Sequence, residues 1–198
     1  MIPIPKTTMK YLPIPVLLLA AGVATAQDMP LHEVLKPGET WQPASGDVPK
    51  VANQPGPVQG AVPLKEPTCA AVALGGSTLL VADAADRYVW AFQIQKDGSI
   101  GPGDRYCRLR VRGDERRKRF TSEEAYKADP SAMTIDGANR TYVATNLGIQ
   151  VFDPTGRLCG VFTAPAGRVT ELAFDGDRLF ARADGKVFVR KMLAEGKK

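Results

Sequence analysis

The stretch AMTIDGANRTYVATNLGIQVFDPTGRLCGVF, residues 132–162, decides the fold of this chain. It contains four short runs of apolar, β-branched and aromatic residues, and turn-forming residues separate each run from the next. The turns IDGANR (135–140) and DPTG (153–156) are typical of tight hairpins, because Asp accepts hydrogen bonds within a turn and Gly tolerates a positive φ. The stretch therefore predicts one sheet of four antiparallel strands.

The same layout occurs on both sides of this stretch. CAAVAL, STLLVADA, YVWAFQI and GSI precede it, and ELAFD, DRLFARA and KVFVRKM follow it. The offset from RTYVAT to RLFARA is 38 residues, whereas that from LLVAD to TYVAT is 62, because a basic insertion, residues 108–128, lies between them. Without the insertion the period is about 40 residues, which is typical of a four-stranded β-propeller blade. Within the insertion we expect one short helix, over residues 122–127.

The sequence thus predicts an all-β fold, a partial β-propeller with about three recognisable four-stranded blades over residues 67–198. Residues 27–66 are rich in Pro and Gly, and we expect them to form an irregular N-terminal arm with Trp41 as its one large anchor. An open propeller exposes strand edges that invite pairing. Either the arm covers one edge, or two chains associate as a homodimer that completes the ring.

Residues 1–26 have the pattern of a signal peptide. Two lysines precede an apolar run, residues 16–23, and the small-x-small sequence Ala-Thr-Ala (24–26) follows as a cleavage site. The run is too short for a membrane anchor, and no cysteine follows the cleavage site to carry a lipid. We therefore expect a mature chain that starts near Gln27, has no membrane span and is secreted or periplasmic.

The composition argues against several classes of function. The 198 residues carry a formal net charge of +5, and loss of two N-terminal lysines reduces it to about +3, which gives no reason to expect nucleic acid as a partner. His32 is the only histidine, so the residues for a Ser-His-Asp triad or a His/Cys zinc site are missing. Cys69, Cys107 and Cys159 have apolar neighbours and are expected to be small buried side chains, although one pair could form a disulfide after export.

Three hydroxyl residues occupy equivalent positions where the repeats begin. Thr68 precedes CAAVA, Ser131 precedes AMTID, and Thr170 precedes ELAFD. In a propeller this position lies at the start of the innermost strand of each blade, so we expect the three side chains to face the mouth of the central channel. Hydroxyls can bind a sugar or a water molecule, but a divalent cation such as calcium prefers carboxylate and amide oxygens.

Three segments of the chain resemble one known family. EPTCAAVALGGSTLLVADAADRYVWAFQIQKDGSI (66–100), the stretch 132–162 and GRVTELAFDGDRLFARADGKVFVRKM (167–192) are similar to the senescence-marker-protein/gluconolactonase/luciferin-regenerating-enzyme family, in a truncated and divergent form. The resemblance implies a six-bladed propeller type with one divalent metal, usually calcium, in its channel. It also implies hydrolysis of sugar lactones, in which the metal polarises the lactone carbonyl and a carboxylate assists the attack of water.

The residues that match the metal-binding motifs of this family depart from its pattern. The Asp slot reads Pro130-Ser131-Ala132-Met133, and the Asn slot reads Pro67-Thr68-Cys69. The Glu expected soon after Trp41 is not found there, and we expect that the early blades that carry it are deleted, so no metal ligand can be named with this alignment. Asp129 and Glu171 are nearby carboxylates that could act as substitute ligands or catalytic groups, whereas strand alternation favours solvated positions for them at the rim.

Two main function classes follow from these observations. The first is a secreted gluconolactonase-like propeller that lacks the metal-dependent sugar-lactone hydrolase activity of the family and acts as a binding or scaffold module, with a small sugar-like ligand. The alternative is an active calcium-dependent lactonase that uses substitute ligands such as Asp129 and Glu171. A third hypothesis places a polyanion or a cell-envelope partner on the basic residues 108–119, where the simpler interpretation is a solvated loop.

Overall fold

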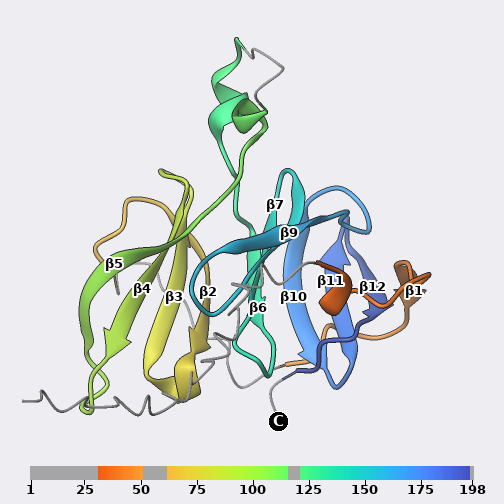
Figure 1. The fold of residues 1–198 in the computed structure, drawn as a ribbon, viewed down its shortest axis with the longest axis horizontal. Helices are drawn as coiled ribbons and strands as arrows, with labels where there is room; N and C mark the ends of the chain where they lie inside the picture. The colour runs from red at the N-terminus through yellow and green to blue at the C-terminus, as the bar shows by residue number, and fades with distance from the viewer. Residues whose placement is uncertain (1–30, 51–61, 116–120, 197–198) are drawn as a thin grey trace, which may run out of the picture.

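The computed structural model describes residues 31–50, 62–115 and 121–196, so the predicted signal peptide and the basic residues 116–119 lie outside the described residues. The described ranges fold into three four-stranded antiparallel sheets that stand next to one another (Figure 1). The prediction of an all-β fold with three blades is confirmed. No helix in these ranges has the length and apolar character needed to cross a membrane.

The first two blades follow the chain in order. The first blade contains β2 (Pro67–Ala73), β3 (Thr78–Asp83), β4 (Tyr88–Ile94) and β5 (Ile100–Arg108), with the 3-10 turn η2 (Leu74–Gly76) between β2 and β3. The second blade contains β6 (Ala132–Ile135), β7 (Thr141–Thr145), β8 (Gly148–Phe152) and β9 (Leu158–Phe162). In both sheets each strand pairs with the next along the chain, as the hairpin signals predict.

The third blade takes its fourth strand from the N-terminal arm. Its other strands are β10 (Val169–Asp175), β11 (Arg178–Ala183) and β12 (Lys186–Lys191), and β1 (Gln42–Ala44) pairs antiparallel with β12. The arm also contains the 3-10 turn η1 (Leu31–Glu33). Trp41 anchors the arm, because its indole Nε1 donates to the Thr163 carbonyl at 2.8 Å and its ring stacks on Phe162 at a centroid distance of 6.3 Å. The arm is therefore less irregular than its composition predicts, and it covers the β12 edge.

Packing between neighbouring blades forms the core. The innermost strand of the second blade, β6, lies between β2 and β10. One apolar cluster joins the first and second blades and includes Leu80, Val89, Leu109, Ile135 and Phe152. A second cluster joins the second blade, the third blade and the arm, and it includes Val34, Tyr142, Ile149, Leu172 and Leu179. The faces at which neighbouring blades meet are therefore mainly apolar, with a few buried polar side chains such as Thr134, Thr141 and Gln150.

The first and third blades each have an outer face that no other described blade covers. Their places on strands predict that Trp90 and Phe180 fill blade cores, but both side chains are only half-buried because they lie on these outer faces. Arm residues on either side of residues 51–61 cover part of each outer face. Val62 and Leu64 pack on the first blade, and Val48 packs on the third.

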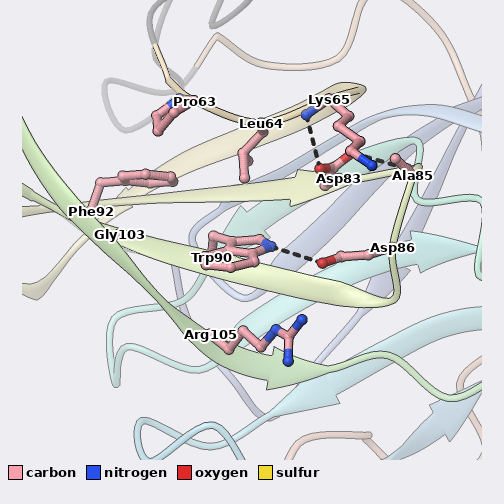
Figure 2. Close-up of a pocket in the computed structure, with 10 residues that line it drawn as sticks. All are labelled: Pro63, Leu64, Lys65, Asp83, Ala85, Asp86, Trp90, Phe92, Gly103 and Arg105. Carbon is pink, nitrogen blue, oxygen red and sulfur yellow. Dashed lines mark hydrogen bonds between the residues drawn. The ribbon is translucent and has the colours of Figure 1, made fainter.

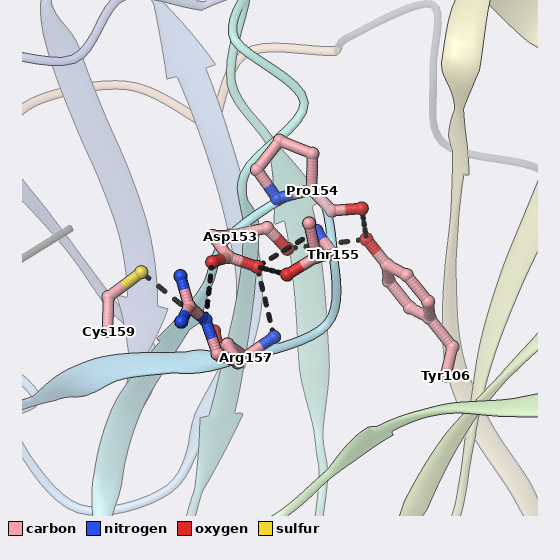
Figure 3. Close-up of polar contacts among 6 residues, drawn as sticks. All are labelled: Tyr106, Asp153, Pro154, Thr155, Arg157 and Cys159. Carbon is pink, nitrogen blue, oxygen red and sulfur yellow. Dashed lines mark hydrogen bonds and ion pairs between the residues drawn. The ribbon is translucent and has the colours of Figure 1, made fainter. Parts of the chain in front are cut away.

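Two tight turns of the second blade are closed by an aspartate in the same way. Asp136 and Asp153 each accept hydrogen bonds from the backbone N–H groups two and four residues later and from the Nε of an arginine four residues later. The turn 153–157 also joins the first two blades, because the Tyr106 hydroxyl of β5 donates to the Pro154 carbonyl at 2.8 Å (Figure 3). Burial raises the pKa of Tyr106 to about 12, so this hydroxyl keeps its proton at neutral pH.

The basic insertion is partly core rather than a wholly solvated loop. Leu109, Val111 and Ala128, near its two ends, are buried in the cluster between the first and second blades. Between these ends the chain projects away from the sheets and forms two 3-10 turns, η3 (Arg112–Asp114) and η4 (Glu123–Tyr126) (Figure 1). The turn η4 stands where the sequence predicts a short helix.

Candidate functional site

A cavity of about 500 Å³ lies where the innermost strands of the second and third blades begin. Three connections at this end of the sheets line it: residues 129–131 before β6, residues 145–148 between β7 and β8, and parts of 163–168 between β9 and β10. Loops at one end of a rigid set of strands are a common place for binding groups. Asp129 and Ser131, two of the predicted site residues, both line this cavity, so we treat it as the candidate site.

Ser131 links the second and third blades at the cavity wall. Its hydroxyl donates a hydrogen bond to the Val169 carbonyl of β10 at 2.6 Å, and its backbone N–H donates to the Ala144 carbonyl of β7 at 3.0 Å. The half-buried hydroxyl therefore uses its one proton between blades and keeps only acceptor capacity for a ligand. A structural hydroxyl thus fills the slot in which the family resemblance implies a metal-binding aspartate.

Thr68 and Thr170 occupy matching positions in the first and third blades, outside the described lining of this cavity. Each stands at a β-bulge, where the pairing register of the innermost strand shifts. The Thr68 hydroxyl donates to the Ala82 carbonyl at 3.3 Å, and the Thr170 hydroxyl donates to the Arg182 carbonyl at 3.4 Å. Both threonines are exposed. Of the three predicted hydroxyls, Ser131 is the one that the structure places in the cavity.

Asp129 and Arg168 form an ion pair at the cavity, between the segment that leads into β6 and the residue before β10. Asp129 has a φ of 48°, a left-handed conformation that Asp tolerates better than most residues. The Asp129 and Arg168 side chains are 45% and 52% exposed, so a ligand can reach both. Burial raises the pKa of the Cys69 thiol to about 12, and the Thr68 hydrogen bond and the positive charge of Arg168 oppose that rise.

Sequence reasoning missed Arg168, although the aligned repeats contain a signal for it. Glu66, Asp129 and Arg168 each stand two residues before the aligned hydroxyls Thr68, Ser131 and Thr170. An acid and a base at equivalent positions of neighbouring blades attract each other once the innermost strands lie side by side. The alignment of repeats does not show that β6 and β10 are neighbours, so it does not predict this ion pair.

Glu171 has a different arginine partner, on the outer face of the third blade. Its carboxylate accepts a hydrogen bond from the Nε of Arg182 at 2.8 Å, and the same guanidinium pairs with Asp47 of the arm at 3.0 Å. Glu171 is outside the described lining of the cavity that contains Asp129. The structure therefore places the two candidate carboxylates in separate ion pairs rather than in one shared site.

The residues of the cavity do not fit a calcium ion. Calcium takes about six to eight oxygen ligands, mainly carboxylates, carbonyls and water. Among the described residues, no group of three His, Cys, Asp or Glu side chains could hold a metal. Asp129 already faces the Arg168 guanidinium, whose positive charge repels a cation. No reaction step through a metal follows from this geometry.

The three cysteines are free thiols in this structure. Cys107 is buried, while Cys69 and Cys159 are half-buried. Burial is the largest effect on each thiol, and it raises the pKa in all three cases. Because the thiolate is the reactive form, these cysteines are not suited to nucleophilic chemistry at neutral pH.

Comparisons with known proteins agree with the blade architecture. The chain matches the model of the SMP-30/Gluconolactonase/LRE-like region over residues 61–181, which is more than half of its length. A gluconolactonase from Xanthomonas campestris has 20% sequence identity and a TM-score of 0.52, over 65% of this chain and 38% of that chain. A luciferin-regenerating enzyme has 18% identity and a TM-score of 0.51, over 67% of this chain and 47% of that chain. The calcium-binding protein regucalcin from Agrobacterium tumefaciens has 13% identity and a TM-score of 0.50, over 68% of this chain and 48% of that chain.

The match covers less than half of the length of each of these three solved chains. At identities of 20% or less, these likenesses show the fold and leave the activity open. No curated protein matches this chain. With three propeller blades in the structure and the family model matched across residues 61–181, the chain belongs to the SMP-30/gluconolactonase/LRE-like family.

Proposed function

We propose that this chain is a gluconolactonase-like binding module that lacks the metal-dependent lactone hydrolysis implied by the family resemblance. The observation that supports this most directly is the Asp129–Arg168 ion pair, which puts a positive charge beside the slot of the missing metal ligand. The commitment of the Ser131 proton to the Val169 carbonyl supports it as well. Lactone hydrolysis needs a group that polarises the carbonyl and a free base for water, and the carboxylates of Asp129 and Glu171 are both paired with arginine.

The cavity suits a small sugar-like ligand such as a polyol or a sugar acid. Its volume of about 500 Å³ lies within the range of small-molecule sites. The half-exposed Asp129 carboxylate accepts hydrogen bonds and the Arg168 guanidinium donates them, so the pair matches neighbouring hydroxyls of a sugar. Titration calorimetry with gluconate tests this proposal. We expect saturable binding that weakens about tenfold in Arg168→Gln, and equal binding by that variant would contradict the assignment.

We expect millimolar calcium neither to raise the melting temperature of the mature protein nor to support hydrolysis of gluconolactone. Thermal unfolding and a proton-release assay measure the two quantities. Stabilisation by calcium together with turnover would contradict the proposal and favour the alternative, an active calcium-dependent lactonase.

A pair of variants tests whether the substituted slot is the reason for this expected result. Ser131→Asp returns a carboxylate to the slot, and the double variant Ser131→Asp/Arg168→Gln also removes the neighbouring positive charge. We expect calcium to stabilise the double variant more than the single variant, because a cation is no longer repelled by a guanidinium. Equal calcium responses would show that Arg168 does not oppose metal binding.

The proposal includes export from the cytoplasm, for which the pattern of residues 1–26 is the support. Those residues lie outside the described part of the chain. Mass spectrometry of the protein recovered from the periplasm or the culture medium measures where the chain begins. We expect a start near Gln27, and a mass that retains residues 1–26 would contradict cleavage.

Of the two alternatives for the open propeller, an arm that covers one edge or a homodimer that completes the ring, the character of the outer faces disfavours the homodimer. Two chains would supply the six blades of the family type, with the third blade of one chain against the first blade of the other. The outer face of the third blade carries the ion pairs Arg178–Asp175 and Arg182–Glu171, whereas the outer face of the first blade combines an apolar cluster with the positive charges of Lys65 and Arg105. Burial of these ion pairs against apolar side chains is costly. We therefore expect light scattering to give the mass of one mature chain, and twice that mass would support the ring.

A further inference from the structure

A second cavity lies on the outer face of the first blade, and none of its lining residues belongs to the candidate site. Its volume is about 360 Å³, which is within the range of small-molecule sites. Arm residues 63–65 form one wall, and β4 and β5 form the other with Trp90, Phe92 and Arg105 (Figure 2). The proposed function makes no use of this cavity.

The aromatic wall of this cavity is held in place by the protein itself. The Trp90 indole Nε1 donates a hydrogen bond to the Asp86 carboxylate at 3.2 Å, which orients the ring (Figure 2). Phe92 is buried and lies against Gly103 of the paired strand, where even a Cβ atom would overlap its ring. Trp90 is half-buried because no other blade of the described residues covers it. The cavity therefore offers a preformed apolar surface to a flat ligand.

The charged groups around this apolar surface differ in how many hydrogen-bond and ion-pair partners they have. The Asp83 carboxylate accepts three backbone N–H groups at 2.9–3.2 Å, and the Asp86 carboxylate accepts one backbone N–H and the Trp90 indole. By contrast, the Arg105 guanidinium lies 4.5 and 5.5 Å from the centroids of two aromatic rings of β4, and it pairs with no carboxylate among the described residues. The Lys65 ammonium also pairs with no carboxylate in the described ranges. The cavity thus presents two cations without a paired carboxylate in the described part of the chain, beside an aromatic wall, together with two aspartates whose oxygens accept N–H groups of the protein.

We propose that this cavity binds a small carboxylate that carries a flat apolar body. The apolar body lies between Trp90 and Leu64, and the carboxylate contacts Arg105, whose planar set of N–H donors matches two carboxylate oxygens. Stacking on the rings of β4 already orients the guanidinium, so the side chain loses little freedom when the ligand binds. The aspartates of this cavity do not provide an equivalent site for a cation, because backbone and indole N–H groups already occupy much of their acceptor capacity.

The chain contains two tryptophans, Trp41 and Trp90, which provides a direct measurement. In a Trp41→Phe background, indole fluorescence reports on Trp90 alone. We expect 3-phenylpropionate to change this emission saturably, with a Kd on the order of 0.1–1 mM. The neutral analogue 3-phenylpropan-1-ol has the same ring and chain, and we expect it to bind about tenfold more weakly. Acetate and inorganic phosphate have charge without an apolar body, and we expect neither to produce a saturable change.

Two arginine variants distinguish a specific effect on binding in this cavity from the general effect of losing a surface charge. Arg105→Gln is expected to weaken 3-phenylpropionate binding about tenfold and to leave the neutral analogue unchanged. Arg178→Gln makes the same change on the third blade, where the guanidinium lies 5.5 Å from the Phe180 ring, and it is expected to leave binding unchanged. Circular dichroism checks that both variants fold. The proposal is overturned if acid and alcohol bind equally, if Arg105→Gln binds the acid as tightly as its parent, or if the emission change does not saturate.

Discussion

Replacement of Asp136 by alanine is expected to lower the free energy of unfolding by about 3–5 kcal/mol. The Asp136 side chain is 0% exposed, and its carboxylate accepts hydrogen bonds from two backbone N–H groups, the Arg140 guanidinium and the Tyr142 hydroxyl. Alanine leaves the Arg140 side chain, which is 11% exposed, without its counter-charge. It also leaves the buried Tyr142 hydroxyl without this acceptor, and such a loss is costly because water cannot replace the partner. Burial raises the pKa of Tyr142, so the hydroxyl remains protonated and needs an acceptor.

Asp153→Ala is the matched control for this prediction. Asp153 closes its turn with the same pattern of backbone and arginine hydrogen bonds, but the Arg157 side chain is 53% exposed. Water can solvate Arg157 after the substitution, so we expect a smaller loss, of about 1–2 kcal/mol. Equilibrium unfolding in urea measures both variants. Equal losses would show that turn geometry, rather than burial of the charge, determines the effect.

The second large effect is expected for Trp41→Ala, which should lower the free energy of unfolding by about 2–3 kcal/mol. Trp41 is half-buried, so the expected loss lies below the range for a fully buried tryptophan. The substitution removes the stacking on Phe162 and the hydrogen bond to the Thr163 carbonyl, which together hold the arm beside the second and third blades. Because β1 continues from Trp41, we also expect its pairing with β12 to weaken. The exposed β12 edge is then available to pair with another chain.

Hydrogen exchange at β12 and urea unfolding measure the two consequences. Trp41→Phe is the control, because phenylalanine retains an aromatic ring against Phe162 and loses only the indole hydrogen bond, for which we expect about 1 kcal/mol. Faster exchange at β12 in Trp41→Ala, but not in Trp41→Phe, is the expected result. Unchanged exchange in both variants would mean that β1 holds the edge without help from Trp41.

Much of the fold follows from local sequence, whereas the candidate site follows from it only in part. Alternating apolar runs and Asp/Gly turns predict the strands of the first two blades, because hairpin pairing depends on residues close together in the chain. The alignment of repeats finds Ser131 and Asp129, which do line one cavity. It does not find the partner of Asp129, because Arg168 lies 39 residues away in the sequence. It also treats Trp90 as a core residue, because a strand pattern does not show whether another sheet will cover its face.

The sequence by itself determined the all-β class, the blade repeat, the family and the serine at position 131, where the family resemblance implies an aspartate. Each of these depends on residue types at short spacing in the chain. Hairpin hydrogen bonds and the alternation of side chains along a strand act over the same short spacing. Only the tertiary structure decided that β1 completes the third blade, that Arg168 neutralises Asp129, and that Trp90 faces a cavity instead of a core. These outcomes depend on which blades become neighbours and which faces remain uncovered. The burial of apolar blade faces determines both, and it involves residues that are far apart in the sequence.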